Sequence, residues 1–152
     1  MLRERRGGQP RLGVIFTVLV LACCLDVVHG ATLTSLTYGS PVRTITNTPS
    51  PLNLIPQSAN VQLTYGGTLA ASKWVALVDS TLNSGTPCVG SQAAATQSKF
   101  VSGVVQADSS KVITIPSHAT NTEKQLDRDK SFAVCFAETD GTSTDATWTD
   151  ST

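Results

Sequence analysis

The residue types that carry most enzyme chemistry are sparse in this 152-residue chain. Nucleophilic catalysis needs a hydroxyl or thiol with a base beside it. After the first thirty residues the only histidine is His118, in a polar segment where we expect a solvated side chain. Ser117 precedes it directly, a spacing that does not by itself join hydroxyl and imidazole, and the chain has no Gly-x-Ser-x-Gly motif. We therefore predict no catalytic residue and no catalysis by this chain itself.

Metal binding is the second chemistry to consider. One histidine and distant cysteines give no CxxC or HxxxH spacing, which argues against zinc. Calcium prefers several oxygen ligands, and acidic residues gather in the final quarter: Asp127, Asp129, Glu138, Asp140, Asp145 and Asp150. The first two should precede a strand and Glu138 and Asp140 should follow it, at opposite ends. We therefore expect solvated acidic loops, with no metal and no cofactor.

Aromatic side chains are the remaining candidates for ligand contact, since Trp74, Trp148 and Tyr38 could stack on sugar rings. Trp74 lies in an apolar run, so we expect it to be buried. Trp148 stands among threonine and aspartate, and we expect it to be exposed. The candidate ligand-contact residues are therefore Trp148 and the nearby Asp140 and Asp145.

The first thirty residues have the pattern of a secretory signal peptide. A basic stretch from Arg3 to Arg11 is followed by an apolar run over 14–25, and Gly30 precedes Ala31. An apolar run of about 12 residues is too short for a membrane span, which needs about 20. We predict cleavage after Gly30, contact with the membrane only during export, and a secreted, extracellular chain over residues 31–152; an uncleaved anchor is the alternative.

Removing residues 1–30 changes the charge and the cysteine content. Seven basic and nine acidic residues remain, so no basic surface is left for nucleic acid, and we predict no nucleic-acid partner. Cys23 and Cys24 leave with the signal. The remaining pair, Cys88 and Cys135, should form a disulfide in an oxidising compartment, with two buried free thiols as the alternative.

The mature chain has the composition of a β-domain. Serine and threonine make up 36 of its 122 residues, and no stretch keeps a helical period. Residues 60–65 alternate between apolar and polar side chains, as in a half-buried strand. Residues 73–79 and 131–138 are apolar on both faces, which is typical of strands in the middle of a sheet.

Further strands are predicted at 42–46, 99–106, 111–115 and 146–149. Asp108-Ser109-Ser110 suggests a hairpin between the second and third of these. Four prolines bracket the first, so we expect an irregular entry segment around 41–56. The string Leu-Thr-Tyr-Gly occurs at both Leu36 and Leu63, and we attribute this to chance or shared strand chemistry rather than to a repeat.

Short strands joined by turn-rich loops predict an all-β fold, a single antiparallel two-sheet sandwich over residues 31–152. The strand order resembles an immunoglobulin-like or fibronectin type III-like sandwich. Trp74 on the third strand and Cys135 on the sixth are similar in placement to the strand-C tryptophan and strand-F cysteine of immunoglobulin domains. Leu63 replaces the strand-B cysteine and Ala133 the corner tyrosine, so the resemblance is to the architecture and not to a particular family.

The resemblance and the missing catalytic groups together favour a secreted or cell-surface module that makes binding, structural or adhesive contacts with an extracellular protein or a glycan. The alternative is a carbohydrate-binding accessory domain or part of a secreted hydrolase. Thr152 falls where a closing edge strand is expected after Trp148, so either the chain is a fragment that lacks its last strand or that strand is very short. Its open sheet edge would allow self-association.

Overall fold

The computed structural model describes residues 30–38, 43–45, 60–116 and 124–151. His118 and most of the predicted entry segment at 41–56 lie outside these ranges. The described residues form strands β1 (Ser35–Tyr38), β2 (Arg43–Ile45), β3 (Val61–Gly66), β4 (Trp74–Asp79), β5 (Val105–Gln106), β6 (Val112–Ile115), β7 (Phe132–Ala137) and β8 (Thr149–Asp150), and two short helical turns, η1 (Leu82–Gly85) and α1 (Gly90–Ala93).

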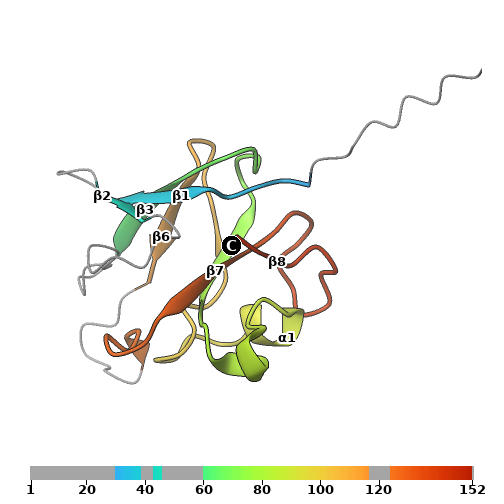
Figure 1. Ribbon diagram of the computed structural model, residues 1–152. Helices are drawn as coiled ribbons and strands as arrows, with labels where there is room; N and C mark the ends of the chain where they lie inside the picture. The colour runs from blue at the N-terminus through green and yellow to red at the C-terminus, as the bar shows by residue number, and fades with distance from the viewer. Residues whose placement is uncertain (1–29, 39–42, 46–59, 117–123, 152) are drawn as a thin grey trace, which may run out of the picture.

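The strands form two antiparallel sheets that pack face to face (Figure 1). The first sheet has the order β2-β1-β3-β6, and the second has the order β5-β4-β7-β8. The predicted all-β, two-sheet sandwich is therefore confirmed. Within the described ranges, none of the helices has the length and apolar character of a membrane span.

The main apolar core lies between the two sheets. Along β3, Val61, Leu63 and Tyr65 are buried, whereas Gln62 and Thr64 are exposed, which confirms the predicted alternation. Side chains of both sheets meet in this core: Leu36, Val61, Leu63, Tyr65, Ile113 and Ile115 from the first, and Val75, Leu77 and Phe136 from the second. We call this set the inter-sheet core.

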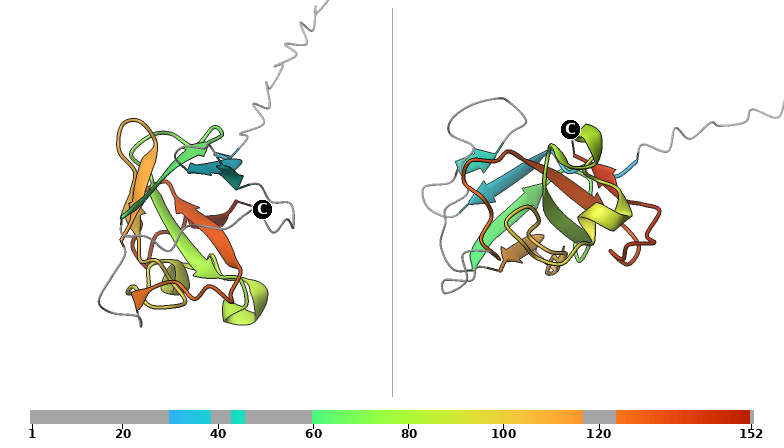
Figure 2. Two further views of the ribbon diagram at one scale, coloured as in Figure 1. Left: turned by 90° about the vertical axis from the view of Figure 1, so that its left-hand side faces the viewer. Right: turned by 90° about the horizontal axis from the view of Figure 1, so that it is seen from below.

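The second sheet is covered on its outer face as well. As predicted for strands that are apolar on both faces, β4 lies between β5 and β7, and β7 lies between β4 and β8. Residues 80–101, which we call the outer layer, carry η1 and α1 across this face (Figure 2). A second apolar cluster joins this layer to the sheet: Ala93 and Val101 from the layer, and Ala76, Val78, Ala133 and Cys135 from β4 and β7.

β1 is a strand that the sequence analysis did not identify. It pairs with β3 so that the Leu-Thr-Tyr parts of the two strings lie side by side, with Leu36 opposite Tyr65 and Tyr38 opposite Leu63. Leu36, Leu63 and Tyr65 are buried in the inter-sheet core, and Tyr38 packs against it. The two strings are therefore alike because both place leucine and tyrosine on the same face of one sheet.

The hairpin predicted at Asp108-Ser109-Ser110 is wrong. β5 pairs with β4 in the second sheet, whereas β6 pairs with β3 in the first, so this turn carries the chain from one sheet to the other. The turn itself is present, because the Asp108 carboxylate accepts hydrogen bonds from the N–H groups of Ser110 and Val112, at 2.7 and 2.9 Å. Each strand completes a different sheet, which no local pattern reveals.

The strand predicted over 99–106 is interrupted in its middle. Val105–Gln106 forms β5, and Val101 makes only an isolated bridge to Val78. Between them the buried Ser102 hydroxyl accepts a hydrogen bond from the Leu77 N–H at 2.9 Å, in the place of a main-chain acceptor. Gly103 follows with φ +74°, a conformation that favours glycine and ends the extended run.

The second sheet has short strands at both edges. β8 pairs with β7 through Cys135 opposite Asp150 and Phe136 opposite Thr149, so the strand predicted at 146–149 forms slightly later, at Thr149–Asp150. β5, at the other edge, is also two residues long. Short edge strands offer few unpaired backbone groups to another chain.

Candidate functional site

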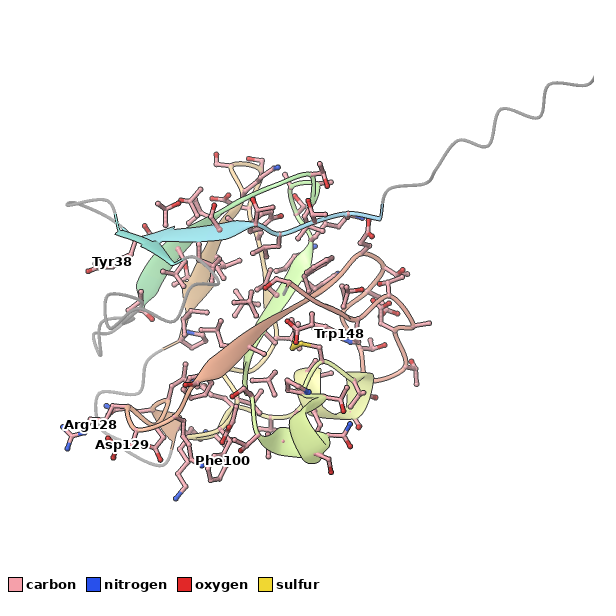
Figure 3. All side chains as sticks on the ribbon, viewed as in Figure 1. Tyr38, Phe100, Arg128, Asp129 and Trp148 are labelled. Atoms are coloured by element: carbon pink, nitrogen blue, oxygen red, sulfur yellow. A yellow bond between two sulfur atoms is a disulfide. The ribbon has the colours of Figure 1, made fainter. Side chains whose placement is uncertain are left out.

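The three candidate ligand-contact residues belong to one loop, residues 138–148 between β7 and β8, which we call the β7–β8 loop. Trp148 lies at its end, and Figure 3 shows this side chain far from Tyr38, which is on the first sheet. Trp74, on β4, lies directly beneath the loop, because a Cβ added at Gly141 would be 2.6 Å from Cγ of the indole. The fold thus adds Trp74 to the loop and separates Tyr38 from it.

Asp145 anchors the β7–β8 loop from inside. The side chain is buried, with 8% of its surface exposed. One carboxylate oxygen accepts hydrogen bonds from the N–H groups of Asp140 and Gly141, both at 2.8 Å. The other accepts from the Thr147 N–H at 2.9 Å and from the Thr147 hydroxyl at 2.5 Å. These four donors occupy the carboxylate, so it holds the loop rather than facing a ligand.

Two opposing effects set the pKa of the Asp145 carboxyl. Burial acts to raise this pKa, because it disfavours the charged form. The hydrogen bonds from Thr147, Asp140 and Gly141 outweigh burial and hold the pKa well below its ordinary value. Asp145 is therefore an ionised, internal anchor at neutral pH.

Further hydrogen bonds tie the rest of the loop to itself and to Lys73, the residue before β4. The Asp140 carboxylate accepts from the N–H and the hydroxyl of Thr142, at 2.9 and 2.8 Å. Trp148 Nε1 donates to the Thr142 carbonyl oxygen at 2.8 Å. At the start of the loop, Lys73 Nζ donates to the Glu138 carbonyl oxygen at 2.5 Å. The exposed residues of this well-held loop are mostly short and polar: Thr139, Asp140, Thr142, Ser143, Thr144 and Ala146.

Both tryptophans of the site are partly buried. Trp148 was expected to be exposed, but its ring packs against the second apolar cluster, and a Cβ added at Gly90 of α1 would be 3.4 Å from its Cδ1. Trp74 was expected to be buried and is covered in part, at Gly141. The two rings therefore support the loop from below, which reduces the aromatic surface open to a sugar.

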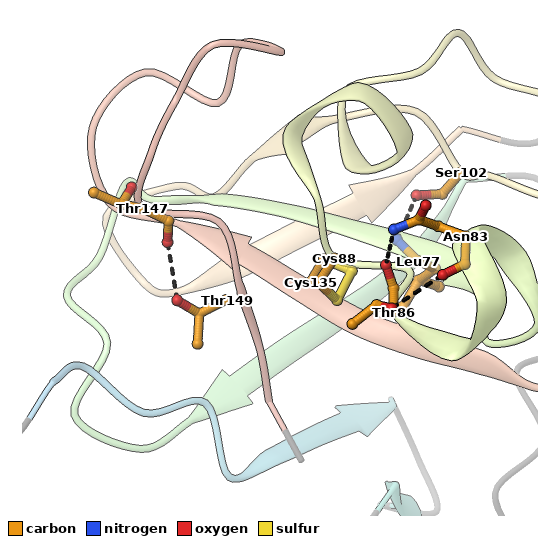
Figure 4. The surroundings of a disulfide bond; sticks show 8 residues. All are labelled: Leu77, Asn83, Thr86, Cys88, Ser102, Cys135, Thr147 and Thr149. Carbon is orange, nitrogen blue, oxygen red and sulfur yellow. Dashed lines mark hydrogen bonds between the residues drawn. A yellow bond between two sulfur atoms is a disulfide. The ribbon is translucent and has the colours of Figure 1, made fainter.

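A disulfide fastens the outer layer to the same sheet. Cys88 and Cys135 are bonded with their Cα atoms 5.2 Å apart, which confirms the predicted pair (Figure 4). Cys135, on β7, is completely buried, and Cys88 lies in the outer layer just before α1. The bridge therefore joins a surface segment to the middle of the second sheet.

The predicted likeness of Trp74 and Cys135 to the immunoglobulin pair fails on orientation. In those domains a disulfide links the two sheets and the tryptophan packs near it. Here Cys135 lies in the cluster under the outer layer, and Val75 and Phe136 are the neighbours that face the first sheet. Successive residues of a strand point to opposite faces. Trp74 and Cys135 are each one position away from a residue that faces the first sheet, so both side chains point away from the inter-sheet core.

The acidic residues separate as predicted. Asp127 and Asp129 precede β7, whereas Glu138 and Asp140 follow it. The Asp127 carboxylate accepts a hydrogen bond from the Asp129 N–H at 3.0 Å. Within the described ranges, no three histidine, cysteine or acidic side chains are grouped so that they could hold a metal ion.

A cluster of cationic and aromatic side chains lies at the opposite end of β7 from the β7–β8 loop. Lys99 Nζ and Lys130 Nζ lie 5.2 and 5.9 Å from the centre of the Phe100 ring, within the range of cation–π contacts. Lys130 Nζ is also 3.5 Å from the buried Asp79 carboxylate. Figure 3 shows Phe100 and Arg128 at this end. Sequence reasoning missed the cluster because pairing of β4 with β7 brings its distant segments together.

The pKa of the Asp79 carboxyl is also lowered. The largest cause is the hydrogen bond from the Thr81 N–H, which burial opposes. The Thr81 hydroxyl and the Lys130 ammonium lower the pKa further. The acid is thus an anchor for the turn that follows β4, in the same way that Asp145 is an anchor for the β7–β8 loop.

Comparison with protein-family models, with curated proteins and with solved structures finds no match to this chain.

Proposed function

We propose that this protein is a secreted or cell-surface β-sandwich module that binds an extracellular protein or a glycan through its β7–β8 loop, without catalysis of its own. The observation that carries the proposal is that some side chains of this loop hold its main chain in place while others are exposed. Asp145, Trp148 and the Asp140 carboxylate hold its main chain, while Thr139, Ser143 and Thr144 are exposed. A loop that is already ordered loses little conformational entropy when it binds.

The exposed side chains of the loop suggest how it would contact a partner. Threonine and serine hydroxyls donate and accept hydrogen bonds, and they suit a polar protein surface or the hydroxyls of a glycan. Both tryptophan rings support the loop from beneath, so a glycan would bind here mainly through hydrogen bonds and not by stacking.

Two features support export. The basic and apolar pattern of residues 1–30 is that of a signal peptide. The Cys88–Cys135 disulfide fits an oxidising compartment, where such bonds persist.

The immunoglobulin-like or fibronectin type III-like architecture remains part of the proposal, supported by strand order. When the short β2 is set aside, the first, second and fifth strands form one sheet, and the third, sixth and seventh lie together in the other. The first, second and fifth strands of immunoglobulin domains likewise share a sheet opposite the third, sixth and seventh. The tryptophan–cysteine pair lends no support, because Val75 and Phe136, and not Trp74 and Cys135, face the first sheet.

The binding proposal is tested with the secreted product of the full-length chain, on a glycan array and on intact cells. Substituting Thr139, Ser143 and Thr144 together by alanine should reduce binding at least about tenfold, because several contacts are removed at once. The matched control replaces Gln62, Thr64 and Ser109 by alanine, which are exposed polar residues elsewhere, and should bind like the wild type. Binding to neither surface, or equal losses in both variants, would overturn the proposal.

A further inference from the structure

The chain enters the fold within one residue of the predicted cleavage site. We call residues 31–34 the N-terminal arm. Ala31 packs against the inter-sheet core, and Leu33 belongs to it with 4% of its surface exposed. Gly30, by contrast, is exposed, and a Cβ added there would meet nothing within 4 Å. The peptide bond between Gly30 and Ala31 therefore lies at the boundary of the packed domain.

Hydrogen bonds hold the N-terminal arm against the turn that follows β3. The Thr34 N–H donates to the Gly66 carbonyl oxygen at 3.0 Å, and the Leu69 N–H donates to the Thr32 carbonyl oxygen at 2.9 Å. The Thr68 hydroxyl accepts from the Thr32 N–H at 2.9 Å, and the Thr68 N–H donates to the Thr32 hydroxyl at 3.3 Å. The backbone of the arm is thus already engaged by residues of its own chain.

The approach of the arm to this turn is unusually close. A Cβ added at Gly67 would be 2.3 Å from the Thr32 carbonyl oxygen, so only glycine allows the contact. Gly67 also has φ +110°, which other residues rarely adopt. The turn is therefore shaped to receive the arm.

A peptidase that cuts at Gly30–Ala31 must take hold of residues on both sides of that bond in an extended form. In the folded chain, the residues on the carboxyl side are buried or hydrogen-bonded, so cleavage would have to wait for the arm to detach. When such opening is faster than cleavage, the rate of proteolysis follows the small population of the open form.

We infer that the Gly30–Ala31 bond is a processing site that is cut before the N-terminal arm docks, while the exported chain is still unfolded there. The inference rests on the proposed signal peptide. A water molecule adds across the peptide bond, the leader leaves with a carboxylate on Gly30, and Ala31 gains a free amino group. Docking then packs Ala31 and Leu33, at the new N-terminus, against the inter-sheet core. Leader removal and folding therefore have a fixed order.

The test compares cleavage of three substrates by purified signal peptidase in detergent. These are a peptide of residues 11–40, the full-length precursor folded with its disulfide formed, and the same precursor with Thr68→Val. The peptide should be cut between Gly30 and Ala31, and the folded precursor should be cut at least about tenfold more slowly. Thr68→Val removes the hydroxyl that holds Thr32 and leaves the cleavage sequence intact, so cleavage should become about fivefold faster than in the folded wild type.

Thr64→Val is the matched control, since Thr64 is an exposed threonine of β3 in the same sheet. It should be cut as slowly as the folded wild type. If the peptide is not cut at this bond, the proposed signal peptide is wrong. If the peptide is cut and the folded precursor is cut equally fast, the signal stands and the ordering of cleavage before docking is wrong. Equal acceleration by Thr64→Val and Thr68→Val would also contradict the role of the arm.

Discussion

The two faces of the second sheet are buried in different ways. On its inner face, large side chains such as Leu77 and Phe136 meet the leucines, valine and isoleucines of the first sheet. On its outer face, the side chains of β4 and β7 under the outer layer are smaller, with Ala76, Ala133 and Cys135 among them, and the covering segment includes only two short helical turns, η1 and α1.

This difference shows how a thin layer can be held on a sheet. Hydrophobic stabilisation grows with the apolar area that is buried, so small side chains under the outer layer contribute less than the inter-sheet core. A disulfide and hydrogen bonds add the stabilisation that the small buried apolar area does not provide. Three sets of such bonds each fix one part of this side of the sheet: the Cys88–Cys135 bridge, the hydrogen bond from the Leu77 N–H of β4 to the Ser102 hydroxyl, and those to the Asp145 carboxylate in the adjoining loop.

The largest expected effect comes from a substitution in the inter-sheet core, on the inner face of the second sheet. Phe136→Ala should lower the free energy of unfolding by about 4 kcal/mol, because it leaves a cavity in the inter-sheet core. Urea denaturation would measure this loss. Phe132→Ala, on the same strand but only partly buried, is the control and should cost clearly less. Equal losses would mean that the inner face is not the dominant core.

Removing the disulfide should have the next largest effect and should act mainly on the outer face. The Cys88→Ala, Cys135→Ala double variant should lose about 3 kcal/mol, since the bridge restricts the unfolded chain. Hydrogen exchange should speed up most at the amides of Ala93 and Ala94, which belong to α1 and its end. Leu63, in the inter-sheet core, should stay protected relative to them. A uniform rise in exchange would contradict the division into two differently held faces.

Asp145→Asn should destabilise the protein by about 2 kcal/mol at neutral pH, because it weakens hydrogen bonds to a buried charge. The folded pKa lies below the ordinary value, so the stabilisation is complete above the unfolded pKa of about 4 and is lost as the pH falls towards the folded pKa. The difference in free energy of unfolding between wild type and variant, measured by urea denaturation, should therefore narrow as the pH falls from about 5 to about 2. Asp129→Asn, at an exposed carboxylate outside this loop, should leave the free energy of unfolding nearly unchanged; a difference that widens in acid would refute the anchoring role of Asp145.

Ser102→Ala should have the smallest effect, about 1.5 kcal/mol, because the buried Leu77 N–H would lose its acceptor (Figure 4). Thermal unfolding monitored by circular dichroism would detect the shift in the midpoint. Ser109→Ala, an exposed serine in the turn before β6, should leave the midpoint within error. A neutral Ser102→Ala would mean that water or a shifted main chain replaces the hydroxyl.

Patterns along the chain predicted the elements whose side chains alternate or are apolar throughout. β3, β4 and β7 were found for this reason, and the parity of the cysteines predicted their bond. β1 was missed, although the Leu-Thr-Tyr string that it shares with β3 was a signal that could have found it. The break at Ser102 was missed because its cause is a hydrogen bond to Leu77 on another strand.

Sequence reasoning grouped the candidate ligand-contact residues but could not predict which of their side chains would be buried. The sequence placed Trp148, Asp140 and Asp145 near one another, since they lie within nine residues of chain. Burial of Asp145 and packing of Trp148 depend on α1, Trp74 and the Thr147 hydroxyl, which come together only in the folded molecule. In the folded chain, Asp145 and Trp148 both hold the main chain of the loop.

By itself, the sequence determined that neighbouring side chains of β4 and β7 fall into two sets, because a strand turns successive residues to opposite faces. It could not determine which set meets the other sheet. That choice depends on which segments stack on each face, and these segments are distant in the chain. The tertiary structure placed Val75 and Phe136 inward, and turned Trp74 and Cys135 outward beneath the outer layer and the β7–β8 loop.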